Sequence, residues 1–127
     1  MNNTIKKYGL LFIKVIVALA FVSAGLAKVS GVEMMVQTFE AIGFGQWFRY
    51  LTGAIEISAA VLLFIPGKQL LGALLLVCTM LGAIAAHWIW LGPSALPAII
   101  LGLLSGVIAF AHLPSKTAFI ERRSALR

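Results

Sequence analysis

A single carboxylate inside an apolar stretch is the feature of this sequence that could do chemistry. Glu56 lies within residues 47–65, where most other side chains are apolar. A carboxylate in hydrocarbon is costly unless it is protonated, paired with a cation or turned toward the protein interior. Glu56 is therefore a candidate for proton exchange, for an ion pair, or for both.

Three other polar residues could share a site with this carboxylate. Lys28 ends the first apolar stretch, His87 lies near the end of the third, and Thr52 precedes Glu56 by one helical turn. From the helical rise, Glu56 lies ~13 Å and His87 ~5 Å below the outer membrane surface, and the Lys28 stem reaches ~6 Å inward. We predict that these four residues form one polar site in the outer half of the molecule.

Two interpretations of this polar site stay open. A carboxylate and an imidazole beside an ammonium group could serve a quinone head group or a proton path. Alternatively, Lys28 and Glu56 form a buried ion pair that sets the register of the helices, and His87 is an interfacial hydrogen-bonding residue. The residue types and their depths are compatible with both.

Several other kinds of site are not expected. His87 and His112 are predicted at opposite membrane faces, so they cannot share an ion, and we predict no metal site. The sequence has no H-E-x-x-H, P-loop or G-x-G-x-x-G motif. Cys78 is the single cysteine, which excludes an internal disulfide and a C-x-x-C pair. We expect it to pack as a small apolar side chain within the third stretch.

The elements that must position these residues are apolar stretches of membrane-spanning length. The chain has 127 residues, of which 61% are hydrophobic and 11% charged, and its mean hydropathy is +1.04. Soluble domains carry about 25% charged residues. The composition therefore indicates an integral membrane protein, with residues 1–127 as a single membrane domain. The net charge of +6 comes with no basic stripe interleaved with aromatic residues, so nucleic-acid binding is not expected.

The predicted fold is all-α, an antiparallel four-helix transmembrane bundle. The spans are predicted at residues ~8–28, ~47–65, ~70–91 and ~97–113, and the short turns between the later ones favour antiparallel neighbours. Residues 33–42 are too few and too polar to span, and we expect a short interfacial helix there.

Small residues are expected where helices approach closely. The predicted packing glycines are Gly25, Gly53, Gly102 and Gly106, of which the last two have GxxxG spacing. Arg49 is interpreted as part of an interfacial aromatic belt that begins the second span.

The distribution of charge predicts the orientation. Basic residues occur in the leader, in the turn at Pro66–Gln69 and in the C-terminal tail, whereas the connection between the first two spans carries Glu33 and Glu40. Both termini are therefore predicted on the cytoplasmic side of a bacterial inner membrane. Lys14, ~9 Å along the first helix, is expected to extend back to that surface.

Four segments, taken in order, resemble the DoxX-like family of small four-span membrane proteins. They are FVSAGLAK at 21–28, GAIE at 53–56, LLFIPG at 62–67 and MLGAIAAH at 80–87, and the likeness covers residues ~10–112. The resemblance places the aG..K motif of the family on Gly25 and Lys28, its G..E motif on Gly53 and Glu56, and its histidine on His87.

The resemblance also implies a function. The family is named for a membrane subunit of a thiosulfate:quinone oxidoreductase, which implies the quinone-side or anchoring subunit of a membrane redox complex. The residues identify no cofactor, and the resemblance is compatible with quinone. The expected partners are the lipid bilayer, a redox subunit and a second copy of the chain. Two alternatives stay open: a non-enzymatic assembly or scaffold protein, and a protein that handles small solutes or lipids.

Overall fold

The computed structural model of this protein describes residues 3–92 and 95–113. Within them the chain is almost entirely helical, which confirms the all-α prediction. The elements are α1 (Asn3–Ser30), α2 (Glu33–Ile42), α3 (Gln46–Leu62), α4 (Gln69–Ala86), the π-helical segment η1 (His87–Leu91) and α5 (Leu96–Ala111). The basic tail that helped to predict the orientation lies outside the described residues.

Most helix bounds follow local sequence signals, and three differ from the predicted spans. Helix α1 begins at Asn3, before the predicted start of the first span. Helix α3, the second predicted span, ends at Leu62 instead of residue 65. Pro66 disfavours helical conformation at the residue before it, so the helix cannot continue into the turn. Gly67 then takes a φ of +83°, which suits glycine, and the chain reverses direction. The third predicted span is not a uniform α-helix, because it widens after Ala86 into η1, where Gly92 N donates to His87 O at 2.8 Å.

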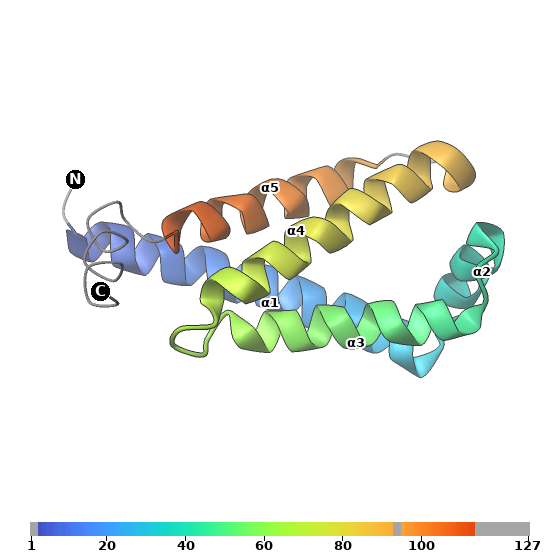
Figure 1. Ribbon diagram of the computed structural model, residues 1–127, viewed down its shortest axis with the longest axis horizontal. Coiled ribbons are helices and arrows are strands. Elements are labelled where there is room, and N and C mark those ends of the chain that lie inside the picture. The colour runs from blue at the N-terminus through green and yellow to red at the C-terminus, as the bar shows by residue number, and fades with distance from the viewer. Residues whose placement is uncertain (1–2, 93–94, 114–127) are drawn as a thin grey trace, which may run out of the picture.

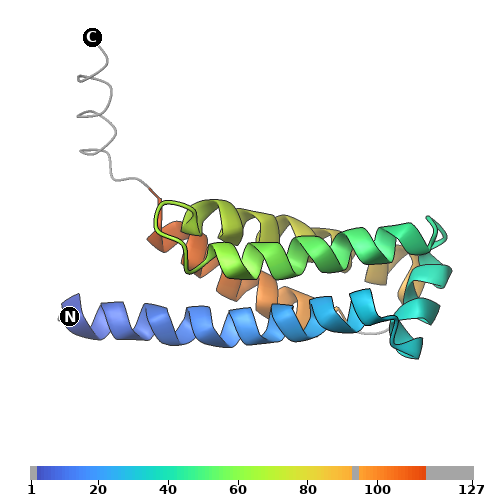
Figure 2. The same cartoon turned by 90° about the horizontal axis from the view of Figure 1, so that it is seen from below.

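The four longer helices run in alternating directions along the long axis of the molecule (Figures 1 and 2). Helix α3 packs between α1 and α4, and α4 packs in turn on α5, which also contacts α1. Helix α2 lies across one end of this bundle, against α3 and η1. A small cluster holds it there, in which Phe39 and Ile42 of α2 pack with Ala86.

Two segments are long and apolar enough to cross a membrane, Thr4–Ser30 and Gln69–Leu91. Helix α3 has 17 residues and lies at the lower limit of spanning length, and α5 has 16 residues and lies just below it. Length and composition therefore support two crossings directly. The predicted four crossings require that the shorter helices α3 and α5 also cross the membrane beside the two longer segments.

The core and the outer surface of the bundle are both apolar. All four long helices contribute buried side chains to one cluster, among them Phe21 of α1, Leu76 of α4 and Ile108 of α5. Outward-facing side chains such as Leu19 and Phe110 are also apolar, and 65% and 78% of their respective surfaces are exposed. Contiguous apolar surface is unusual on a soluble monomer and suits contact with lipid.

Glycines set the two closest helix approaches. A Cβ atom on Gly25 of α1 would lie 2.8 Å from the carbonyl oxygen of Gly53 in α3, and one on Gly53 would lie 2.9 Å from the carbonyl oxygen of Gly25. Gly72 of α4 approaches α3 in the same way, because its Cβ would lie 2.7 Å from Ala59 O. Backbone this close leaves no room for a side chain. The sequence analysis did not single out Gly72.

The glycines of α5 behave differently. A Cβ atom on Gly102 would lie 3.3 Å from Met80 Cβ, which is a tight side-chain contact, whereas nothing lies within 4 Å of one on Gly106. Of the two glycines with GxxxG spacing, only Gly102 therefore contacts α4, and the pair does not form a helix-packing interface within the chain.

Candidate functional site

The centre of the candidate site is an ion pair between α1 and α3. Lys28 Nζ lies 3.0 Å from Glu56 Oε1 and 3.1 Å from Glu56 Oε2, so the ammonium group lies against both carboxylate oxygens. The side chain of Glu56 is 1% exposed and that of Lys28 13%. Mutual attraction offsets part of the cost of removing both charges from water.

The helix crossing explains why these two side chains meet. Lys28 and Glu56 each follow by three residues one of the glycines at the crossing, Gly25 and Gly53, and residues three apart share a helix face. A Cβ atom on Gly53 would lie 3.0 Å from Lys28 Cβ, so the glycine leaves space for the lysine stem. The close approach and the ion pair are therefore parts of one contact.

Arg49 extends the polar site, and sequence reasoning missed this role. Its side chain is 5% exposed. Its Nε donates to Gln46 Oε1 at 2.7 Å, and its Nη1 donates to the main-chain carbonyl of Lys28. That carbonyl belongs to the last turn of α1, where oxygens lack helical partners and a positive charge is favourable.

The predicted place of Arg49 in an aromatic belt describes only its contact with Tyr50. Its guanidinium carbon lies 4.3 Å from the centroid of the Tyr50 ring, while its Nη1 donates to α1 and its Nε to Gln46 of α3. Gly31 provides the room, since a Cβ there would lie 3.4 Å from Arg49 Nη1. The available signal was a basic residue on the side predicted to be the outer one, against the usual charge bias.

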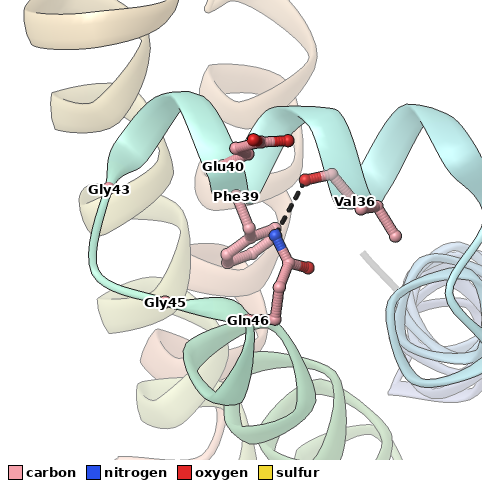
Figure 3. A pocket seen from close by; sticks show the side chains of 6 residues that line it. All are labelled: Val36, Phe39, Glu40, Gly43, Gly45 and Gln46. Atoms are coloured by element: carbon pink, nitrogen blue, oxygen red, sulfur yellow. Dashed lines mark hydrogen bonds between the residues drawn. The ribbon is translucent and has the colours of Figure 1, made fainter.

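Gln46 connects this arginine with α2. Its Nε2 donates to the main-chain carbonyl of Val36 at 3.0 Å, drawn as the dashed line in Figure 3. A series of hydrogen bonds thus joins α2 through Gln46 and Arg49 to the Lys28 main chain, and the Lys28 side chain continues to Glu56. The three helices α1, α2 and α3 are fastened at the same end of the bundle.

An open pocket of about 400 Å³ lies beside the hydrogen bond between Gln46 and Val36. Its lining comes from α2 and from the turn into α3, and Figure 3 shows the side chains. The lining residues are Val36, Phe39, Glu40, Gly43, Gly45 and Gln46. Glu40 and Gln46 give the pocket polar side chains, and Phe39 gives it an aromatic wall.

Among the described residues, two of the four predicted to form the polar site make no hydrogen bond with Lys28 or Glu56. Thr52 Oγ1 donates to Phe48 O of its own helix at 2.8 Å. His87 begins η1, and its buried Nδ1 has no hydrogen-bond partner among the described residues. No hydrogen bond or ion pair in this part of the chain connects either residue with Lys28 or Glu56. The structure thus brings together Lys28 and Glu56 and adds Arg49 and Gln46.

Two expectations about single residues were wrong, because the rotation of each helix about its axis decides which side chains face the core. Cys78 is exposed, since Gly72, Leu76 and Met80 form the buried face of α4 and residue 78 lies on the other side. Lys14 is only 9% exposed and does not extend to the surface. It follows the same face of α1 as Val17 and Phe21, which point into the core.

A metal site and a second ligand pocket would each require particular groups among the described residues. Within residues 3–92 and 95–113, no three His, Cys, Asp or Glu side chains lie together where they could hold a metal ion. A hollow of about 240 Å³ between α4 and α5 is lined by apolar residues and glycine, which are Val77, Met80, Leu81, Ile84, Ile99, Gly102 and Leu103. It offers no charged group that could orient a solute.

Comparisons with known proteins find one family and one curated relative. The family model described as the DoxX-like family matches residues 12–112. A relative from Bacillus subtilis (strain 168), named "Putative oxidoreductase CatD", is 34% identical over 84 residues, which are 66% of this chain and 62% of the relative. The match thus spans less than two thirds of the length of that relative. No solved structure matches this chain.

Proposed function

This chain belongs to the DoxX-like family of membrane proteins, and from this we propose that it is the membrane subunit of a quinone-linked redox complex. The single observation that carries the proposal is the ion pair Lys28–Glu56, with a carboxylate that is 1% exposed. Ionisable residues inside membrane segments most often serve ion, proton or substrate paths. The redox name of the Bacillus relative supports the same class of function.

The proposed arrangement has four membrane crossings. Helix α1 and the α4–η1 segment are long enough by themselves, and α3 and α5 run beside them with apolar outer faces. Lys6, Lys7 and Lys68 lie at one end of the bundle, and the acidic helix α2 lies at the other. The basic end then faces the cytoplasm of a bacterium, and α2 lies at the outer interface.

The proposed chemistry is proton exchange coupled to quinone. Reduction of a quinone to a hydroquinone takes up two electrons and two protons, and oxidation releases them. Glu56 would accept or donate a proton, and the Lys28 ammonium would stabilise the carboxylate form between turnovers. The partner redox subunit would supply or accept the electrons, because this chain has a single cysteine and no flavin motif.

The pocket beside α2 is the proposed place for the quinone head group. Its volume of about 400 Å³ lies within the usual range of small-ligand sites. Gln46 and Arg49 connect the α2 side of this pocket by hydrogen bonds to the main-chain carbonyl of Lys28, the residue whose side chain pairs with Glu56.

The test compares two carboxylate substitutions in native membranes. We expect Glu56→Gln, which keeps the shape and removes the charge, to lower quinone-linked oxidoreductase activity about 10²-fold or more. Glu33→Gln is the matched control, since Glu33 is exposed and bonds only Gln37 in its own helix. Full activity of Glu56→Gln at equal protein level would refute the proposal.

A second candidate function is a non-enzymatic assembly or scaffold protein. It is favoured by the position of the ion pair at the crossing of α1 and α3, where the charges and Arg49 hold three helices together. In that case Glu56→Gln lowers the stability of the protein and of its complex, while the activity per assembled complex stays unchanged. Activity measured per folded protein therefore separates the two functions.

A further inference from the structure

At the end of the bundle opposite α2, two nitrogen-bearing side chains are buried without an acceptor. Lys14 is 9% exposed, and within the described part of the chain its ammonium group has no hydrogen bond or ion pair. The Nε2 atom of His112 is buried, and it too has no hydrogen-bond partner there. Buried polar groups normally have partners, and a buried charge without one is costly.

These two side chains belong to one place. Lys14 is on α1 and His112 directly follows α5, and the two helices lie side by side at this end (Figures 1 and 2). Lys14 precedes Val17 by one helical turn and His112 follows Ile108 by one turn, and Val17 and Ile108 belong to the same buried cluster. The α1 helix also projects beyond the end of α5, as Figure 2 shows, and His112 directly follows the last residue of α5.

No acidic side chain in the described residues forms an ion pair with Lys14. Glu33 and Glu40 are on α2 at the other end, and Glu56 is paired with Lys28. The remaining acidic residue, Glu121, lies outside the described residues. The nearby surface adds further positive charge, since Lys6, Lys7 and Lys68 are all exposed at this end.

We propose that Lys14 and His112 form a binding site for a phosphate group. Phosphate oxygens accept hydrogen bonds from an ammonium group and from an imidazole N–H at the same time, and such charge-assisted bonds are strong. The ends of the helices are the level of lipid head groups in the proposed orientation, and basic residues there attract anionic lipids. The phosphate is that of an anionic lipid head group or of free phosphate. This site is separate from the quinone-linked one.

The test counts ligands bound to the full chain in neutral detergent. Native mass spectrometry measures binding of dioleoyl phosphatidylglycerol against dioleoyl phosphatidylcholine. A second arm adds inorganic phosphate at constant ionic strength and follows the thermal unfolding temperature. The variants are Lys14→Met and His112→Gln, and the matched control is Lys7→Met, an exposed lysine of the same helix.

We expect Lys14→Met to reduce the preference for the anionic lipid about five- to tenfold, and Lys7→Met to leave it within about twofold. His112→Gln should have a smaller effect in the same direction. A phosphate-dependent rise in unfolding temperature that disappears in Lys14→Met would support the site and identify free phosphate as its ligand. Because Lys14→Met removes an unpaired buried charge, that variant should be at least as stable as the parent without ligand.

Three results would overturn the proposal. One is unchanged binding of phosphatidylglycerol and of phosphate in Lys14→Met. Another is an equal loss in Lys7→Met, which would indicate diffuse surface attraction. The third is destabilisation by Glu121→Gln that depends on Lys14, since the chain itself would then supply the acceptor.

Discussion

The Lys28 ammonium lies 3.0 Å from the Glu56 carboxylate, at the point where α1 and α3 cross on Gly25 and Gly53. The charges and the glycines therefore depend on each other. Without the close crossing, the lysine stem would not bring its ammonium group to the acid, and without the ion pair the crossing would bury two uncompensated charges.

A double-mutant cycle measures this relationship. Each of Lys28→Ala and Glu56→Ala should destabilise the folded protein by about 3–5 kcal/mol, because each leaves a buried charge alone. The double variant should lose less than the sum of the two, with a coupling of about 0.5–3 kcal/mol. Equilibrium unfolding in detergent gives the three values. Additive losses would show that the two charges do not stabilise each other.

Arg49 should be required for the attachment of α1 to α3. Arg49→Ala removes the bonds to Gln46 Oε1 and to the Lys28 carbonyl, with an expected loss of about 1–3 kcal/mol. Arg49→Lys should restore little, since an ammonium lacks the planar fork that reaches both acceptors. The exposed Lys7→Ala should stay within about 0.5 kcal/mol in the same unfolding assay. Full rescue by lysine would contradict this geometry.

The glycine crossing predicts a sharp difference between two similar substitutions. Gly53→Ala places a methyl group 2.9 Å from Gly25 O, which neither backbone can avoid, so we expect destabilisation of about 1–3 kcal/mol. Gly106→Ala meets nothing within 4 Å and should be neutral or stabilise by up to about 1 kcal/mol. Thermal unfolding of both variants checks the difference. Similar effects at the two positions would count against the crossing.

The four-crossing arrangement predicts which side each loop faces. In a Cys78→Ser background, a cysteine at Lys7 or Lys68 should react with a membrane-impermeant maleimide only from the cytoplasmic side, and one at Glu33 only from the opposite side. Labelling of right-side-out and inverted vesicles reads this out. If the Glu33 and Lys68 positions react from the same side, α3 does not cross the membrane.

Local sequence signals predicted the helices well. The α2 helix lies at the predicted residues 33–42, and the turn at Pro66–Gln69 separates α3 from α4, because proline and glycine act on the backbone wherever the chain lies. Composition indicated a membrane protein for a similar reason, since apolar content does not depend on the fold. The π-helical segment at His87–Leu91 had no comparable local signal.

The sequence by itself determined the helical segments, the position of each polar residue along its helix and the presence of an acid in an apolar setting. Only the tertiary structure decided how each helix is rotated, and with it the pairing of Lys28 with Glu56, the inward direction of Arg49 and Lys14, and the outward direction of Cys78. In a soluble helix, an apolar stripe shows which face is buried. Here the faces toward the core and away from it are both apolar, so rotation is set by glycine crossings and polar contacts between helices.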